Sequence, residues 1–327
     1  MASYAIFLAT GHAIRSKSIK GDTISNYLLA ASTLISLFDP IKRDARKLDQ
    51  SDKICDAVTR VIKEVKRFEK VPKRCEAYTI AMHRRLFETT RFVSKDCSNA
   101  ANFDWNGVGL QGGNRRSEWC QDRGSGILTK IELSPIGDTK AFTLSDITFY
   151  ARNKVELKLE AAMKQPDSIM HTRVCYTWQK NGDHGLYRWY SRNDKSKYLC
   201  SVQCWTRIVQ RFIRLRGNNI ADQPLSVYRN KSGSVRNITA DICTSLMRSL
   251  AVEVYGLTKK SEIQAFSCHS LRVGACCILY ATGYSGEFIQ RALRWRSEAW
   301  KTYVRDLVVV TIQHNKAMSE ADTMPLM

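Results

Sequence analysis

Four residues near the C-terminal end of the chain could together carry out chemistry on a phosphate group. His269 and Arg272 stand three residues apart, a spacing that places two side chains on one face of a helix. Trp295 follows Arg272 by 23 residues, and Tyr303 follows Trp295 by eight. A tyrosine can form covalent intermediates, but its phenol has a pKa of about 10, so nearby cations must favour its phenolate character. The order of these residues therefore indicates a tyrosine nucleophile assisted by an imidazole and a guanidinium.

Two predicted helices position these residues. Ser267 can cap the first helix and Gly283 can end it. The buried face of this helix would consist of residues that recur at helical spacing: Val273, Cys276, Cys277 and Tyr280. Ser297 can cap the second helix, whose apolar residues recur in steps of three and four: Trp300, Tyr303, Val304, Leu307 and Val308. Singly, each of these residues is typical of ordinary packing or of a solvated surface, so the hypothesis depends on their joint order.

The segments HSLRVGA and RWRSEAWKTY resemble the tyrosine recombinase (phage-integrase) superfamily. The second motif of that family reads His-x-x-Arg, followed by a His or Trp and then by the Tyr. The form with Trp looks most like the eukaryotic Crypton-type and related mobile-element recombinases. The resemblance implies that Tyr303 is the nucleophile, that His269 assists proton transfer, and that Arg272 and Trp295 bind phosphate oxygens. One residue departs from the pattern, because Arg294 stands where many members have a glycine.

The first motif of the same family, Arg-x-Ser-Glu after a glycine-containing turn, is similar to the residues that end the Asn- and Gly-containing segment 94–119. Taken alone, this segment would be interpreted as a basic loop before a helix. The resemblance implies that Arg115 is the first catalytic arginine and that Glu118 orients the site. Arg116 is the competitor shifted by one residue, but only Arg115 has a glutamate three residues later.

Residues 171–191 predict a β-hairpin, because β-prone segments flank the turn residues 180–185. The resemblance implies a catalytic lysine on such a hairpin, where it reaches the minor groove of DNA and protonates the leaving 5′ oxygen. Lys180 is the candidate, and Lys140 and Lys154 are alternatives. The interval from Arg115 to Lys180 is longer than in compact members, which predicts an insertion within residues 120–170.

Composition indicates a polyanionic partner. The chain has 327 residues and a net charge of +20, and it shows no apolar run long enough to span a membrane and no signal peptide. We therefore expect a nucleic-acid partner, no membrane, and an intracellular location that is nuclear if the source is eukaryotic. The 11 cysteines lack CxxC spacing and the six histidines do not pair with them at zinc-finger spacing, so we expect reduced, buried thiols and no metal site.

The chain predicts a mainly α fold with a small antiparallel β-sheet, of the α+β class. Helices are predicted from Thr23 to Phe38, from Ser51 through Ile54 to Val65, over residues 79–91 and 199–216, and from Thr239 onward, with a strand over residues 141–151. Residues 1–68 resemble a helical core-binding domain that clamps DNA, residues 69–76 read as a linker, and residues 77–327 as the catalytic domain. Basic residues are expected to contact DNA phosphates: Arg43, Arg46, Lys53, Arg60, Lys63 and Arg116.

The function that follows is a site-specific DNA recombinase or integrase. It would cleave and rejoin double-stranded DNA by transesterification through a 3′-phosphotyrosyl intermediate, without a metal ion or a small-molecule cofactor. We expect a homo-oligomer, with a dimer on one DNA site and a tetramer in synapsis. Two alternatives remain: a catalytically silent, domesticated DNA-binding protein on the same scaffold, and an enzyme like a type IB topoisomerase that relaxes DNA on its own.

Overall fold

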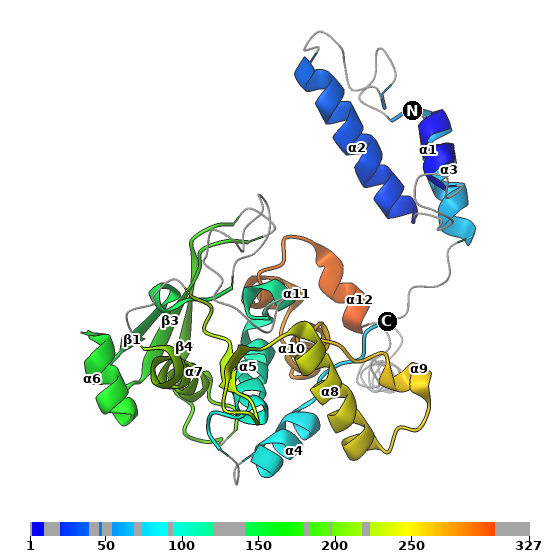
Figure 1. The fold of residues 1–327 in the computed structure, drawn as a ribbon. Helices are drawn as coiled ribbons and strands as arrows, with labels where there is room; N and C mark the ends of the chain where they lie inside the picture. The colour runs from blue at the N-terminus through cyan, green and yellow to red at the C-terminus, as the bar shows by residue number, and fades with distance from the viewer. Residues whose placement is uncertain are drawn as a thin grey trace, which may run out of the picture. The chain divides into compact units, whose positions relative to one another are not determined.

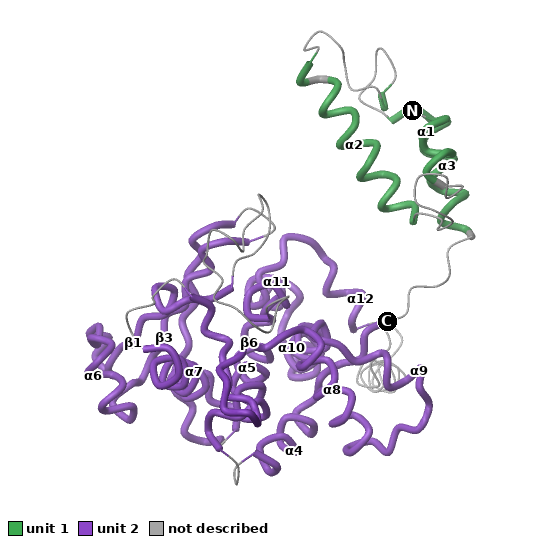
Figure 2. Tube along the Cα trace, in the orientation of Figure 1, with its two compact units in different colours: residues 1–73 green, residues 74–327 purple. Residues whose placement is uncertain are grey.

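The computed structural model describes residues 2–9, 20–38, 46–47, 54–68, 74–90, 94–120, 141–179, 183–196, 198–217 and 223–304. The chain divides into two compact units, residues 1–73 and residues 74–327 (Figure 2). The boundary falls inside the segment 69–76, so that residues 74–76 of the predicted linker belong to the second unit. Within the described ranges, no helix is both long and apolar enough to cross a membrane.

The described residues of the first unit form three helices: α1 (Ala2–Ala9), α2 (Gly21–Phe38) and α3 (Asp56–Phe68). Its small core consists of buried residues from all three helices: Ala5, Leu8, Ile24, Leu28 and Val58. Two predicted helix starts were wrong, because α2 begins two residues before Thr23 and α3 begins at Asp56. Ile54 instead forms an isolated β-bridge with Lys47. The C-terminal half of α2 contributes less to this core, because its apolar residues Leu34 and Phe38 are exposed.

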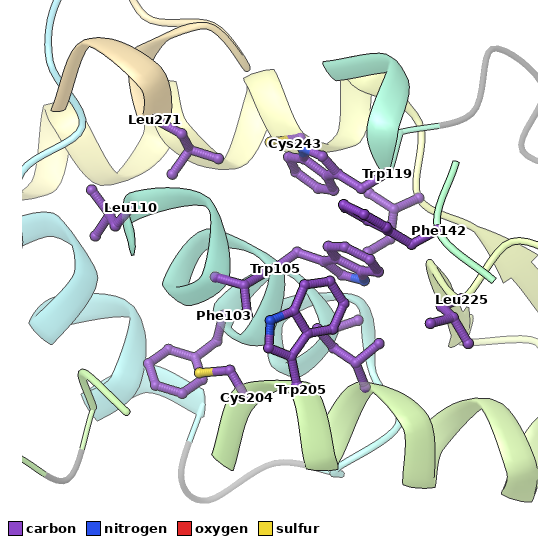
Figure 3. Close-up of a cluster of buried hydrophobic side chains, with 14 of the residues drawn as sticks. Phe103, Trp105, Leu110, Trp119, Phe142, Cys204, Trp205, Leu225, Cys243 and Leu271 are labelled. Atoms are coloured by element: carbon purple, nitrogen blue, oxygen red, sulfur yellow. The ribbon is translucent and has the colours of Figure 1, made fainter. Parts of the chain in front are cut away.

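The second unit is built around helix α5 (Ser98–Gly112), which packs against α4 (Ile80–Thr90), α7 (Ser201–Arg216) and α10 (Ser270–Ala281) (Figure 1). Aromatic side chains fill the core beside α5 (Figure 3). The ring of Trp105 stacks on Trp119 with 5.6 Å between centroids and meets Trp205 edge-on at 5.4 Å. These indole contacts fix α5 against α7 and against the residues that follow the first motif.

The sequence did not predict α5. Residues 94–119 were interpreted only as an Asn- and Gly-containing segment that ends in the first motif. This helix is buried on nearly all sides, so it lacks the apolar stripe that marks a half-exposed helix. Its glycines permit close approach of the neighbouring helices. A Cβ atom on Gly107 would lie 2.7 Å from Cys204 Sγ, and one on Gly109 would lie 2.9 Å from Leu271 Cδ1.

One antiparallel sheet contains β1 (Ile147–Tyr150), β2 (Glu156–Leu157), β3 (His171–Tyr176) and β4 (Leu186–Ser191), in the order β2-β1-β3-β4. The pair β3–β4 confirms the predicted hairpin. The strand predicted over residues 141–151 is shorter, because residues 144–146 form a 3-10 turn, η2 (Leu144–Asp146), before β1. A second small hairpin joins β5 (Val227–Arg229) to β6 (Val235–Asn237). The α+β fold class is therefore confirmed.

The predicted helices α4, α7 and α8 (Ala240–Tyr255) are confirmed, as is the predicted cap at Thr239, and Thr79 caps α4 in the same way. Thr79 Oγ1 accepts a hydrogen bond from the backbone N–H of Met82 at 3.3 Å, and Thr239 Oγ1 accepts one from Ile242 at 3.3 Å. The remaining elements are short: η1 (Arg116–Glu118), α6 (Leu159–Lys164), η3 (Pro166–Ser168), α9 (Lys260–Ile263), α11 (Gly286–Leu293), η4 (Glu298–Trp300) and α12 (Lys301–Val304). Leu307 and Val308 lie outside the described residues.

Candidate active site

The helix that carries the second motif begins later than the sequence predicts. Helix α10 starts at Ser270, so Arg272 lies in its first turn and His269 is the residue at its N-cap. Ser267 caps the preceding turn instead, since its Oγ accepts a hydrogen bond from the backbone N–H of His269 at 3.2 Å. Gly283 ends the helix as predicted: its φ is +84°, a value that favours glycine.

The predicted nucleophile docks on α10 of the same chain. The backbone carbonyl of Tyr303 lies 3.6 Å from Cys277 Sγ, and that of Trp300 lies 3.8 Å from Cys276 Sγ. This packing places the Tyr303 hydroxyl 2.8 Å from Nε2 of His269. The structure thus brings the phenol and the imidazole, 34 residues apart, within direct hydrogen-bonding distance.

Trp295 and Arg272 complete this part of the site. The Arg272 guanidinium carbon lies 4.7 Å from the centre of the Trp295 ring, and that ring lies 5.4 Å from the ring of Tyr303. Arg272 is buried and donates a hydrogen bond from Nη1 to the carbonyl oxygen of Gly113 at 2.7 Å. Gly113 has a φ of +56° and ends α5. The central helix therefore holds the guanidinium in place beside the tyrosine.

The first motif lies close enough to Arg272 for the charge of Arg115 to act on it. Glu118, in η1, is only 1% exposed, and its Oε2 accepts a hydrogen bond from the backbone N–H of Arg115 at 2.9 Å. Arg115 Nη1 lies 3.3 Å from Glu118 Oε1, and the positive charge of Arg115 acts on Arg272. The two predicted arginines thus share one site, while Arg116 points to solvent.

Arg294 is the residue that sequence reasoning missed. It adopts the left-handed conformation, with a φ of +57°, at the C-terminal end of α11. Its buried guanidinium pairs with Glu118 through two bonds, Nη1 to Oε1 and Nη2 to Oε2, each 2.9 Å long. A third bond, of 2.9 Å, joins Nη1 to Oε1 of Gln179. One feature of the sequence could have revealed this role: an arginine stands where many members of the family have a glycine. The backbone at this position has the left-handed conformation that glycine favours, so a large side chain there needs a structural reason.

Gln179 connects the hairpin to both motifs. Its side-chain oxygen accepts from Arg294 at 2.9 Å and lies 3.4 Å from Arg115 Nη1. Lys180, the predicted general acid, follows Gln179 in sequence and lies outside the described residues, as does the alternative Lys140. The other alternative, Lys154, is exposed in the turn between β1 and β2.

The site carries more positive than negative charge. Arg115 and Arg294 both pair with Glu118, whereas no carboxylate in the described part of the chain pairs with Arg272. Burial, together with the charges of Arg115 and Arg294, lowers the pKa of Arg272 to about 9, so this guanidinium is still charged at neutral pH. Burial alone would raise the pKa of Glu118, but the two paired arginines outweigh it and lower that pKa. An anion bound beside Arg272 would balance the excess charge.

The protonation states suit proton transfer from the tyrosine to the histidine. Desolvation and the charge of Arg272 lower the pKa of His269 below its ordinary value, so the imidazole is neutral at pH 7. Burial raises the pKa of Tyr303, and the opposing effect of Arg272 does not offset it. At neutral pH the phenol therefore keeps its proton, and a neutral imidazole lies at the position where it can accept that proton.

The predicted DNA contacts are spread over both units. Arg60 and Lys63 are exposed on α3, and Arg46 is half-buried in the turn before the β-bridge. Arg43 and Lys53 lie outside the described residues. Within the second unit, two arginines of α7, Arg207 and Arg211, both pair with Asp104. These two guanidiniums join α7 to α5, and that of Arg211 is buried.

Comparison with known proteins gives similarity to solved structures alone. No family model matches the chain, and no curated protein matches it. The structure is similar to the integrase of transposon Tn1549 (residues 82–397) in complex with circular intermediate DNA, with a TM-score of 0.47 and 11% identity over 97% of this chain and 84% of the other. It is also similar to the XerH site-specific recombinase bound to palindromic difH, with a TM-score of 0.46 and 15% identity over 98% and 71% of the two chains. For the XerA recombinase the TM-score is 0.39 and the identity 14%, over 99% and 100%. Because every one of these TM-scores lies below 0.5, we base the function on the geometry of the site.

Proposed function

We propose that the protein is a tyrosine-type DNA breaking and rejoining enzyme that acts as a site-specific recombinase or integrase. One observation carries the proposal: the Tyr303 hydroxyl lies 2.8 Å from His269 Nε2, beside the buried guanidinium of Arg272. A phenol, an acceptor for its proton and a cation for the phosphate are the three groups that a tyrosine nucleophile needs. The tryptophan at position 295 is the feature that favours the Crypton-type mobile-element branch of this superfamily.

In the proposed reaction, the Tyr303 oxygen attacks the phosphorus of a DNA phosphodiester while His269 accepts the phenolic proton. A 3′-phosphotyrosyl bond forms, the bond to the 5′ oxygen breaks, and Lys180 protonates that leaving oxygen. A 5′-hydroxyl from a partner strand then reverses the step, because the covalent bond keeps the energy of the phosphodiester. The chemistry is therefore balanced without a nucleotide cofactor.

Arg115 and Arg272 would hold the nonbridging oxygens of the phosphate. A guanidinium can donate two parallel hydrogen bonds to such oxygens, and it stabilises the extra negative charge that develops in the transition state. Trp295 would donate its indole N–H to a phosphate oxygen. Because the guanidiniums supply the positive charge at the reacting group, the proposed reaction needs no metal ion.

The partner that we propose is double-stranded DNA, in keeping with a net charge of +20. The first unit would act as the core-binding domain, with Arg60 and Lys63 on the exposed face of α3 toward phosphates. Exchange between two DNA sites requires a protomer at each cleaved strand, so the working form would be a dimer on each site and a tetramer in synapsis. The compartment would be intracellular, and the nucleus in a eukaryote.

Covalent trapping tests this proposal. Duplexes that bind the full chain are first selected from a random-sequence library, and then synthesised with a 5′-bridging phosphorothiolate at each candidate phosphate. The sulfur leaving group needs no general acid and cannot readily reverse the reaction, so the adduct accumulates. Incubation with excess EDTA should give a denaturant-resistant protein–DNA adduct with the wild type and none with Tyr303→Phe. Tyr280→Phe, which alters a partly buried tyrosine of α10 outside the site, is the matched control and should give the wild-type yield.

The outcomes separate the alternatives. An adduct that persists in Tyr303→Phe would show that another residue is the nucleophile. Salt-sensitive binding of selected duplexes with no adduct from any substrate would favour the silent DNA-binding protein. An adduct accompanied by relaxation of a plasmid that carries a single site, without exchange between two sites, would favour the topoisomerase-like enzyme.

A further inference from the structure

Three cysteines from distant parts of the sequence meet in the core of the second unit. Cys120 follows η1, Cys243 lies in the first turn of α8, and Cys268 directly precedes His269. All three side chains are buried, and their sulfur atoms lie within 4.8 Å of one another. The Sγ atoms of Cys120 and Cys268 are 3.8 Å apart although the residues are separated by 148 positions. Within the described ranges, this is the single group of three or more His, Cys, Asp and Glu side chains close enough to share a metal ion.

We propose that Cys120, Cys243 and Cys268 form a binding site for Zn²⁺ with a structural role. Zinc binds cysteine sulfur at about 2.3 Å in a tetrahedral arrangement, which places neighbouring sulfur atoms about 3.8 Å apart. The Cys120–Cys268 distance already has this value. The widest separation allowed within the group, 4.8 Å, is about 1 Å too long and can be closed by small rotations of the cysteine side chains.

Oxygen atoms close to the sulfurs can supply the fourth ligand position. The Ala240 carbonyl oxygen lies 3.4 Å from Cys268 Sγ, and the Thr244 hydroxyl lies 3.6 Å from it. The group belongs to the main hydrophobic cluster, which also contains Trp119, and Figure 3 draws Cys243 and Trp119 together. A closed, apolar surrounding of this kind is typical of a structural zinc site rather than a catalytic one, which keeps a position open.

Binding replaces the thiol protons by the metal ion, because zinc coordinates cysteine as the thiolate. Three thiolates and one Zn²⁺ leave a single negative charge on the buried group, compared with three for the thiolates alone.

The site would tie together the parts of the chain that present the two motifs. Cys120 lies two residues after Glu118, and Cys268 lies one residue before His269. A metal ion bound to both would fix the distance between η1 and the start of α10, with α8 as the third anchor. This proposal departs from the sequence-based expectation of no metal site, because three cysteines without CxxC spacing give no zinc signal until the fold brings them together.

The test uses the full chain, purified under a non-chelating reductant, and the metal ions alone as probes. Mass spectrometry of the metal content should give about one zinc per chain. After removal of zinc with a strong chelator, titration with Co²⁺ should produce a sulfur-to-cobalt charge-transfer band and the visible absorption of tetrahedral cobalt. The band should be lost or strongly weakened in Cys243→Ser and Cys268→Ser. It should be unchanged in Cys204→Ser, which alters a buried cysteine of α7 outside the cluster.

Circular dichroism of each variant shows whether it folds, and the wild-type cobalt titration tests the proposal without any variant. Folded wild-type protein that gives no charge-transfer band would overturn it. So would a band of equal intensity in both cluster variants, or a Cys120–Cys268 disulfide in protein that takes up no metal after reduction. None of these readouts uses DNA, so their failure is distinct from failure of the proposed recombinase activity.

Discussion

Two buried carboxylates in the second unit are each held by a pair of arginines, yet only one of the two groups lies in the candidate active site. Asp104 of α5 pairs with Arg207 at 2.6 Å and with Arg211 at 2.5 Å, both from α7. Like Glu118, Asp104 is 1% exposed. The group around Asp104 joins two packed helices, and its role is to hold them together.

The group around Glu118 has an additional cation nearby. Arg115 and Arg294 pair with Glu118 at 3.3 and 2.9 Å, and Arg272 is buried close to them without a carboxylate partner in the described residues. Burial, and then repulsion from the guanidiniums of Arg115 and Arg294, lower the pKa of Arg272. A buried carboxylate paired with two arginines by itself therefore indicates packing, whereas an extra buried guanidinium indicates a place for an anion.

The largest effect on stability is expected at the packing group. Asp104→Asn leaves the buried guanidinium of Arg211 without its charge partner and should lower the free energy of unfolding by about 3–5 kcal/mol. Urea denaturation followed by tryptophan fluorescence measures this loss. Asp96→Asn is the matched control: its pair with Arg214, at 2.6 Å, has side chains 21% and 45% exposed. That control should lose less than about 1 kcal/mol, and equal losses in the two variants would contradict the assignment.

Arg272→Lys should separate catalysis from stability. Loss of one preorganised donor at a developing charge typically costs about 2.7–4 kcal/mol, so adduct formation with the phosphorothiolate duplex should slow by about 10²–10³-fold. The free energy of unfolding should fall by less than about 1.5 kcal/mol, because the bond to Gly113 is the main contact at risk. Arg211→Lys should show the reverse, with lower stability and a normal rate for the folded fraction. If Arg211→Lys slowed adduct formation as much as Arg272→Lys does, the group around Asp104 could not be distinguished from the group around Glu118.

Arg294→Gly tests how much the ion pair between Arg294 and Glu118 stabilises the fold. Glycine relieves the left-handed backbone, a gain of about 1–2 kcal/mol, while loss of the buried partner of Glu118, which then keeps only Arg115 at 3.3 Å, costs about 3–5 kcal/mol. The free energy of unfolding should therefore fall by about 1–4 kcal/mol. Adding Glu118→Gln should recover part of this loss, because it removes a buried charge that has lost one of its two arginine partners, and a double-mutant cycle measures the coupling. If Arg294→Gly stabilised the protein by the full gain of about 1–2 kcal/mol expected from glycine, the ion pair would contribute nothing to stability.

The smallest expected effect concerns pH. Because the pKa of His269 is lowered from its ordinary value, protonation of the imidazole should slow adduct formation only below about pH 6.5. Below the pKa of His269 the rate should fall about tenfold per pH unit. Single-turnover rates with the phosphorothiolate duplex at constant ionic strength measure this limb, and His269→Gln should remove it. A limb centred above pH 7 would mean that a different group accepts the proton.

Local sequence patterns determined much of the fold. The cap Thr239, the apolar spacing of residues 199–216 and the turn residues 180–185 each predicted an element that is present, because short-range spacing decides caps, stripes and hairpins. Helix α5 escaped prediction for a physical reason. A helix that is buried on nearly all sides and rich in glycine has no contrast between its faces.

The sequence by itself also determined the order of the candidate site residues, from Arg115 to Tyr303. Only the tertiary structure decided their distances, because α12 must fold back on α10 before the Tyr303 hydroxyl reaches His269. The pairing of Arg294 with Glu118 across 176 positions and the meeting of three cysteines are likewise products of packing. Spacing along a chain fixes which side chains share a helix face, whereas contacts between distant segments depend on how the buried surfaces of those segments fit together.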